Sequence, residues 1–132
     1  MDNNNPCLFC DKENQKFKLI VENDFCVARW DANPVSKGHA LIIPRKHILS
    51  FFDLKEDELV KMFSLMKEVK NVIQKEYNPD GFNIGINDGE AAGRTIHHLH
   101  IHLIPRYKGD VENPRGGVRH IIPGKGNYPT SS

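Results

Sequence analysis

The most chemically distinctive stretch of the sequence is a run of three histidines at alternate positions, His98, His100 and His102. Apolar residues fill the positions between and after them: Leu99, Ile101 and Leu103. A period of two predicts a half-buried strand with the imidazoles on one face and the apolar side chains on the other. Because every imidazole carries a donor and an acceptor that need partners, we expect the histidine face to line a site rather than a core.

The spacing of these histidines favours one kind of ligand. On a flat strand their Cα atoms lie roughly 6.6 Å apart, which disfavours a metal bound by all three, since metal–nitrogen bonds are only about 2.0 Å long. An extended anion such as a phosphate chain suits the row better, because each ring can contact a different oxygen. The preceding loop adds donors for a phosphate: Asn87, Gly89, Gly93, Arg94 and Thr95. An incidental run of surface histidines is the competing interpretation.

A second candidate site is the C-x-x-C formed by Cys7 and Cys10. This spacing suits two zinc ligands on one turn, and His47 with one histidine of the row could complete a Cys2His2 set. The alternative is that both cysteines are small buried hydrophobes. A redox role is disfavoured, because that motif normally lies between a strand and a helix of a βαβ unit. Cys26 makes the cysteine count odd, which argues against a disulfide framework.

The bulk properties limit the possible partners and locations. The chain has 132 residues, and we expect a single domain over 1–132, with a loose N-terminus at 1–6 and an irregular tail at 107–132. A net charge of +1 gives no electrostatic basis for binding nucleic acid or an acidic membrane. No apolar run approaches the ~20 residues of a membrane span, and the first residues show no signal-peptide pattern. These features predict a cytoplasmic protein.

The elements that must position these residues can be predicted from periodicity. We expect four further strands: 16–22, 24–30, 39–43 and 82–87. Between the third and fourth of these, a three- to four-residue spacing predicts one long helix, with Asp53 and Glu56 as its capping box and an end near Tyr77. The apolar positions that define this helix are Leu59, Phe63, Met66, Val69 and Ile73. The order predicts an α+β fold: an antiparallel sheet of about five strands with one long helix and a short helix. The broad apolar helix surface favours a dimer.

Together these motifs resemble the histidine triad (HIT) superfamily of nucleotide hydrolases and transferases. The run from His98 to Ile104 matches its His-φ-His-φ-His-φ-φ signature, in which φ is an apolar residue. Further matching segments are the C-x-x-C, Gly38-His39 before an apolar strand, the stretch 43–48, and Asn87 before a Gly-rich loop. Ile104-Pro105-Arg106 is similar to bacterial and fragile-histidine-triad-like members. The resemblance implies a HIT-like fold with the sheet continued across a homodimer.

The resemblance implies that His100 is a nucleophile, which attacks the α-phosphorus of a nucleotide and forms a covalent nucleotidyl-imidazole. Its other ring nitrogen must donate to a neighbour, and we expect a backbone carbonyl. His102 and Asn87 would contact phosphate oxygens, and Thr95 would assist the leaving group. Arg94 stands where many members have Gln, so the contact to the leaving phosphate is expected to differ here.

The resemblance also implies a nucleoside pocket and a metal. Asp31 would accept from the ribose hydroxyls, and His39 would support the triad from behind. The implied base pocket consists of Leu8, Phe9 and Trp30. A structural zinc ion would be held by Cys7, Cys10, His47 and His98.

The leading hypothesis is therefore a nucleotidyl hydrolase or transferase acting on a diadenosine polyphosphate or a nucleoside phosphoramidate. The alternative is a nucleotide-binding regulatory or scaffold protein whose chemistry is vestigial. A small zinc-stabilised nucleic-acid-binding module is a third, disfavoured by the near-neutral charge. Basic and apolar residues alternate in the tail, so we expect it to pack across the dimer near the site, with Arg119 neutralising polyphosphate; a disordered terminus is the competing interpretation.

Overall fold

The computed structural model of this protein describes residues 7–10 and 18–128. The segment expected to be loose, 1–6, lies outside these residues, as does the start of the strand expected at 16–22. The strands are β1 (Leu19–Glu22), β2 (Cys26–Trp30), β3 (Ala40–Pro44), β4 (Gly81–Gly85) and β5 (Ile101–Arg106). The helices are α2 (Glu56–Tyr77) and the short 3-10 helices η1 (Leu8–Cys10), η2 (Phe51–Asp53), η3 (Glu90–Ala92) and η4 (Gly117–Ile121).

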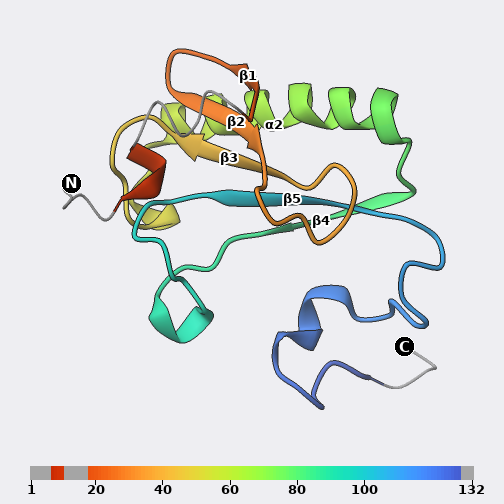
Figure 1. The fold of residues 1–132 in the computed structure, drawn as a ribbon. Helices are drawn as coiled ribbons and strands as arrows, with labels where there is room; N and C mark the ends of the chain where they lie inside the picture. Colours follow the sequence, from red (N-terminus) through yellow and green to blue (C-terminus); the bar gives the residue numbers. More distant parts are fainter. Residues whose placement is uncertain (1–6, 11–17, 129–132) are drawn as a thin grey trace.

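The five strands form one antiparallel sheet in the order β1-β2-β3-β5-β4. The 22-residue helix α2 lies across one face of this sheet (Figure 1). The predicted α+β fold, with about five antiparallel strands and one long helix, is therefore confirmed. Among the described residues, no helix combines the length and apolar character that crossing a membrane requires.

The buried face of α2 differs in part from the predicted one. Val69 and Ile73 are fully buried as expected, but Leu59 and Phe63 are 40% and 56% exposed. The side chains that complete the buried stripe are Met62 and Leu65. The prediction went wrong because this helix carries apolar residues on both sides of its true interface, so spacing alone does not choose between two overlapping stripes.

The N-terminus of α2 also begins later than the predicted cap. Lys55 is the N-cap residue, and the carboxylate of Glu58 accepts from its backbone N–H at 3.0 Å. The same carboxylate accepts from the Lys46 ammonium at 2.7 Å, and these contacts lower the Glu58 pKa. Asp53 lies in η2 instead. The capping-box pattern is thus present two residues beyond the predicted one.

The sheet has a core on each face, because strands in its middle alternate between them. The larger core lies under α2 and includes Ala40 and Ile42 of β3. The smaller core lies on the opposite face, where Leu41 and Ile43 of β3 pack with Phe9 of η1. The opposite face is covered only in part by this smaller core, and the rest of it is available to hold a site.

The histidine run is less regular than predicted, since β5 begins at Ile101 and leaves His98 and His100 before it. The backbone N–H of His98 turns back to the Ile96 carbonyl at 2.9 Å. That of Leu99 donates to the Ile48 carbonyl at 2.7 Å. The apolar side chains of the run still point into the larger core, as alternation predicted: Leu99, Ile101 and Leu103.

Within residues 107–128, the described part of the tail after β5, η4 is the only helix or strand, and it lies beside the edge strand β4 (Figure 1). The guanidinium carbons of Arg115 and Arg119 lie 4.8 and 4.7 Å from the ring centre of Tyr128. Arg119 also donates to the Gly126 carbonyl at 3.1 Å. Cation–π contacts of this kind hold the tail together, so the Arg119 guanidinium is engaged within the tail.

Candidate active site and metal centre

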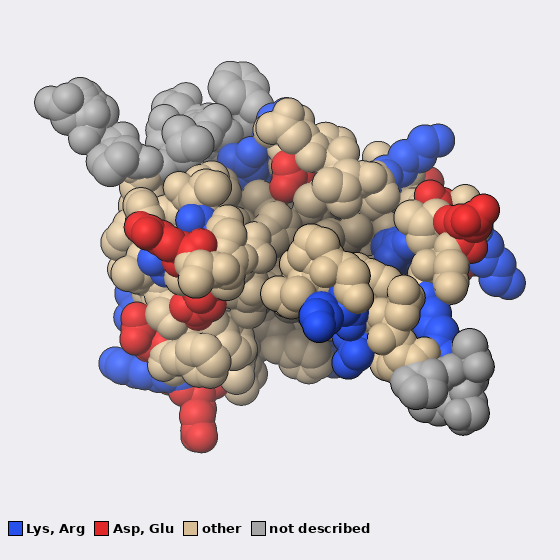
Figure 2. All heavy atoms as spheres, turned by 90° about the horizontal axis from the view of Figure 1, so that it is seen from below, with Lys and Arg blue, Asp and Glu red and all other residues tan. Residues whose placement is uncertain are grey.

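The sheet face opposite α2 carries a cavity of about 520 Å³. Figure 2 shows this side of the molecule, which is hollowed between the surrounding side chains. Of the residues predicted for the site, those that line the cavity are Phe9, Asp31, Asn87, Gly93, Arg94, Thr95, His100 and His102. Segments far apart in the sequence therefore converge on one space large enough for a nucleotide-sized ligand.

The His100 ring is held in a defined tautomer. Its Nδ1 lies 2.9 Å from the backbone carbonyl of His98. A carbonyl can only accept, so Nδ1 carries the proton and Nε2 keeps its lone pair. The Phe9 ring packs against the imidazole with ring centres 4.8 Å apart and restricts its orientation. The expectation that a backbone carbonyl fixes this ring is confirmed, and the lone pair of Nε2 is left free to accept a hydrogen bond.

A chain of hydrogen bonds sets the opposite tautomer at His102. The Val35 backbone N–H donates to His39 Nδ1 at 3.2 Å. The proton of neutral His39 must then lie on Nε2, which is 2.9 Å from His102 Nδ1 and 3.4 Å from the Asp31 carboxylate. Since His102 Nδ1 accepts, its Nε2 carries a proton and can donate to a ligand oxygen. His39 thus does not line the cavity but orients a residue that does.

Burial keeps these imidazoles neutral. It lowers the pKa of His102 to about 4, aided by the nearby His100 and His39 and opposed by Asp31. Burial likewise lowers the pKa of His100, against the hydrogen bond to His98 and the charge of Asp31. The pKa of His39 is lowered for the same reason. At neutral pH the site therefore presents one acceptor nitrogen, on His100, and one donor, on His102.

Two cations at the cavity were missed by sequence reasoning. Arg29 and Lys18 line it, and Arg29 is only 4% exposed, with its guanidinium carbon 5.6 Å from the Phe9 ring centre. Burial lowers the Arg29 pKa, and the charge of Asp31 opposes that shift. The sequence signal available for Arg29 was only its place inside the predicted strand 24–30, where alternation puts it on the opposite face from Trp30.

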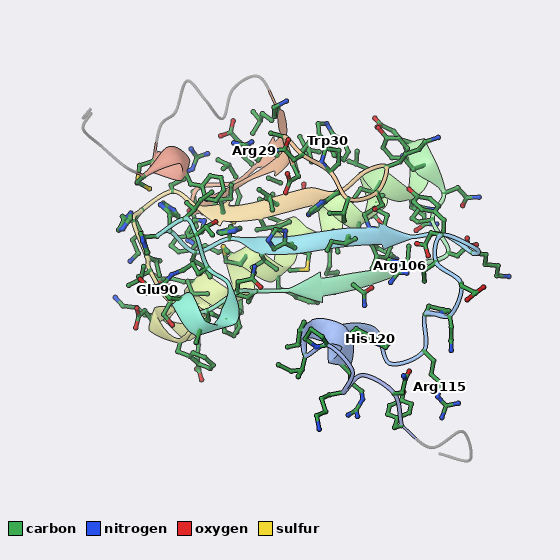
Figure 3. All side chains as sticks on the ribbon, turned by 60° about the horizontal axis from the view of Figure 1, so that its bottom comes forward. Arg29, Trp30, Glu90, Arg106, Arg115 and His120 are labelled. Atoms are coloured by element: carbon green, nitrogen blue, oxygen red, sulfur yellow. The ribbon has the colours of Figure 1, made fainter. Side chains whose placement is uncertain are left out.

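Two residues predicted for the base pocket are not shown at the cavity. Trp30 packs against the larger core, with its ring 6.1 Å from that of Tyr77 at the end of α2. Alternation along β2 explains the correction, because Arg29 faces the cavity and its neighbour must face α2. Leu8 lies in η1, but its side chain is outside the described part of the chain. Figure 3 shows that Arg115 and His120 lie in the tail beside β4, away from Arg29.

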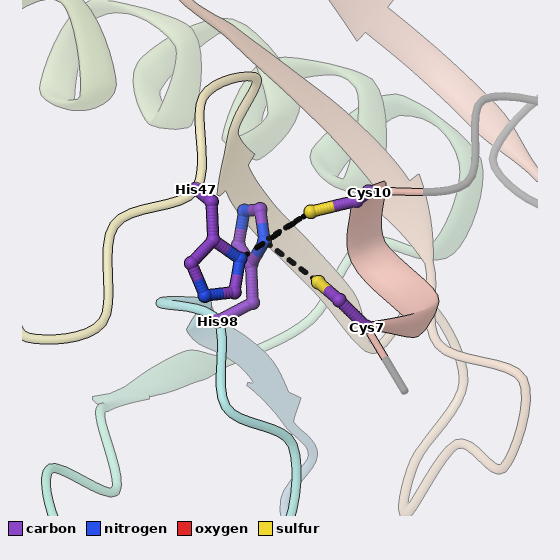
Figure 4. A group of neighbouring side chains, drawn as sticks. All are labelled: Cys7, Cys10, His47 and His98. Atoms are coloured by element: carbon purple, nitrogen blue, oxygen red, sulfur yellow. Dashed lines mark hydrogen bonds between the residues drawn. The ribbon is translucent and has the colours of Figure 1, made fainter. Parts of the chain in front are cut away.

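The four predicted metal ligands form a separate cluster at the end of the sheet nearest η1 (Figure 4). Their ligand atoms all lie within 4.8 Å of one another. His98 Nδ1 is 3.1 Å from Cys7 Sγ and 3.3 Å from Cys10 Sγ, and His47 Nδ1 is 3.3 Å from Cys10 Sγ. These separations are close to the edges of a tetrahedron with metal–ligand bonds of about 2.0–2.3 Å. The residues present therefore fit a metal ion.

The protonation of this cluster also suits a metal. His98 is fully buried, and its Nε2 donates to the Pro44 carbonyl at 2.9 Å, so its Nδ1 lone pair faces the two sulfurs. Such a carbonyl is the usual partner of a metal-binding histidine. Burial, followed by the hydrogen bond and charge of Cys7, raises the pKa of the Cys10 thiol to about 11. A divalent cation would reverse that balance by stabilising the thiolates.

A cavity beside alternate histidines, on an antiparallel sheet covered by one long helix, defines a histidine triad protein. The comparison with protein families agrees, since the HIT domain matches residues 12–109. Because this match covers most of the sequence, the chain belongs to the HIT family.

Individual relatives extend the comparison. An uncharacterized HIT-like protein of Methanocaldococcus jannaschii is 39% identical over 118 residues, or 87% of this chain and 91% of the relative. A bis(5'-nucleosyl)-tetraphosphatase (asymmetrical) of Schizosaccharomyces pombe is 42% identical over 93 residues, or 70% of this chain but 51% of that enzyme. Among solved structures, a Zn-bound histidine triad family protein of Mycobacterium smegmatis has a TM-score of 0.69 at 30% identity, with 79% of this chain and 77% of that chain covered.

Proposed function

We propose that this protein is a nucleotidyl hydrolase or transferase that cleaves a nucleotide substrate at its α-phosphate through a covalent intermediate on His100. The observation that carries the proposal is the fixed tautomer of His100, whose Nδ1 donates to the His98 carbonyl and leaves Nε2 as a neutral nucleophile in the cavity. The name of the Schizosaccharomyces relative supports a nucleotide polyphosphate as the substrate class.

The reaction has two displacements at phosphorus. In the first, the His100 Nε2 lone pair attacks the α-phosphorus, so that an N–P bond forms while the bond from phosphorus to the leaving group breaks. Thr95 lines the cavity, and in this proposal its hydroxyl donates a hydrogen bond to the departing atom. In the second, water attacks the same phosphorus, the N–P bond breaks, Nε2 regains its lone pair, and the proton of the water passes to solvent.

The other cavity residues orient the substrate and stabilise charge. His102 Nε2–H and the Asn87 amide are the donors for the α-phosphate oxygens. Asp31 keeps lone pairs for the ribose hydroxyls, although its Oδ1 already accepts from the Asn33 backbone N–H at 2.8 Å. Phe9 supplies an aromatic wall beside His100, and Trp30 has no part in this pocket.

We propose that the metal at Cys7, Cys10, His47 and His98 is a structural zinc ion, which crosslinks η1 to the segment that precedes β5. Its proposed role is to hold Phe9 and the His98 carbonyl in place against His100. The Zn-bound Mycobacterium relative and the thiol–imidazole ligand set of this chain support zinc. The same proposal includes a homodimer with a continued sheet, a cytoplasmic location and a single domain over 1–132.

Turnover by matched variants tests the assignment. Release of nucleoside monophosphate would be measured from diadenosine tetraphosphate, an AMP–lysine phosphoramidate and ADP. We expect His100→Ala to lower kcat at least about a thousandfold while AMP binding is retained, because the covalent route is lost and the pocket remains. His97→Ala removes a neighbouring, exposed histidine and should behave as wild type. Substantial wild-type turnover that His100→Ala retains would refute the assignment of the nucleophile. Negligible turnover by the wild type on all three substrates would instead favour a nucleotide-binding scaffold.

A further inference from the structure

A tight turn at residues 36–39 precedes β3 and leads into His39. The His39 backbone N–H donates to the Ser36 carbonyl at 3.2 Å. Gly38 has a φ of 87°, which suits the third residue of such a turn and favours glycine there. Because the turn ends at the histidine that contacts His102, its placement affects the ring that orients His102.

Two hydroxyl groups fasten this turn to the end of β5. The Ser36 hydroxyl donates to the Pro105 carbonyl at 2.7 Å, and the Tyr107 hydroxyl donates to the Lys37 carbonyl at 2.6 Å. Regular pairing between β3 and β5 ends before Pro105, so both bonds lie where the sheet no longer holds the two segments together. We call these two hydrogen bonds the turn clamp.

The turn clamp lies beside the donor that sets the tautomers of the site. The Val35 backbone N–H donates to His39 Nδ1 at 3.2 Å, and Val35 directly precedes Ser36. The Val35 side chain is 72% exposed, so its own packing does not hold that N–H in place. The bond from Ser36 does, because it ties the backbone beside Val35 to β5, the strand that carries His102.

Loss of the Val35 donor would change what His102 presents to a ligand. Without it, His39 Nδ1 can carry the ring proton, and His39 Nε2 then accepts from His102 Nδ1 across the same 2.9 Å contact. His102 Nε2 would become an acceptor, which cannot bind a phosphate oxygen. The Asp31 carboxylate, 3.4 Å from His39 Nε2, favours the original proton position, so the expected result is a mixture of both tautomers.

We propose that Ser36 and Tyr107 are positioning residues, whose turn clamp keeps His102 Nε2 a hydrogen-bond donor toward the phosphate of a bound nucleotide. Neither is among the described residues that line the cavity, and each acts through the backbone of the turn. The inference rests on the proposed function, in which His102 contacts the α-phosphate. A serine that only helped the chain to fold would affect stability and leave the tautomer of His102 unchanged.

The tautomer of His102 is the direct readout. Protonated and unprotonated imidazole nitrogens differ widely in 15N chemical shift, so long-range 1H–15N spectra of the full chain report which nitrogen carries the proton, and the spectrum of His102→Gln identifies the signals. We expect the proton on Nε2 in wild type, and shifts moved toward the other tautomer in Ser36→Ala and Tyr107→Phe. Ser36→Thr keeps the hydroxyl and should resemble wild type. Ser50→Ala is the matched control, because it loses a hydroxyl hydrogen bond to Asp88 outside the clamp, and it should leave the tautomer unchanged.

Kinetics connect the tautomer to the reaction. We expect Ser36→Ala to lower kcat/KM on diadenosine tetraphosphate about tenfold, as the loss of one hydrogen bond to the phosphate implies, and Ser36→Thr to restore it. Tyr107→Phe keeps the ring, so it tests the clamp even if Ser36→Ala does not fold. An unchanged His102 tautomer in a folded variant would overturn the role of the residue it lacks, while the proposed function stands. A shifted tautomer in a protein without turnover would support the clamp and refute only the proposed function.

Discussion

His102 should make folding stability depend on pH, because burial lowers its pKa from 6.5 to about 4 in the folded protein. Between these values the unfolded chain binds a proton at this residue that the folded protein does not. Stability should therefore be fully present above pH 6.5 and be lost as the pH falls toward 4. The shift gives a loss of about 2 kcal/mol between pH 7.5 and pH 5 from this one side chain.

The perturbation is His102→Gln, which removes the titrating ring and keeps a side chain that can donate a hydrogen bond. The free energy of unfolding would be measured by urea denaturation at several pH values between 7.5 and 5, in wild type and variant. His97→Gln serves as the control, since it removes an exposed histidine from the same segment. Both variants keep all four metal ligands, so metal release at low pH affects them alike.

The expected result is a pH-dependent loss of stability that is about 2 kcal/mol smaller in His102→Gln than in wild type or His97→Gln. The absolute stability at pH 7.5 is not the readout, because the variant also loses the contact to His39. Parallel pH curves for wild type and His102→Gln would show that burial does not lower the pKa of His102 in the folded protein. The conclusion that burial keeps this imidazole neutral would then be wrong.

Two further perturbations test the metal and the loop that carries His39. We expect elemental analysis to find one zinc ion per wild-type chain, and Cys10→Ser should lose that ion and have a lower Tm. Cys26→Ala changes a buried cysteine outside the cluster and should keep the zinc. An absence of metal in wild type expressed with ample zinc would contradict the assignment. Gly38→Ala should destabilise by about 1–3 kcal/mol in urea, because a Cβ there would lie 2.9 Å from the Tyr77 ring at a φ of 87°. Gly109→Ala is its control, with a φ of 83° and nothing within 4 Å, and equal losses in the two would refute the steric reason.

Sequence reasoning was sufficient for the sheet and the helix because their periodicity is strong, and insufficient where two patterns overlap. In α2 the residues Leu59 and Phe63 form a stripe beside the real one, and only packing against the sheet decides between them. In β2 the adjacent Arg29 and Trp30 must face opposite sides, and the motif favoured the wrong one for the cavity. The four residues that the HIT resemblance named as metal ligands do lie together, although His98 precedes β5 in irregular backbone.

The tautomers of the site could not be read from the sequence. The donor at His102 depends on the Val35 N–H that reaches His39. That contact closes the loop before β3, in which Gly38 has a left-handed φ of 87°. Lys18 and Arg29 were missed for a similar reason, as their place at the cavity depends on the register of β1 and β2 rather than on a local motif.

The most direct test of the central claim is to trap the covalent intermediate. Wild-type protein would be mixed with excess diadenosine tetraphosphate, quenched within milliseconds in alkaline denaturant, which preserves N–P bonds, and analysed by intact and peptide mass spectrometry. The account predicts a mass increase of one adenylyl group on the peptide that contains residues 98–102, localised to His100 and absent from His100→Ala. Rapid product formation without any adduct, or an adduct on a different residue, would contradict it.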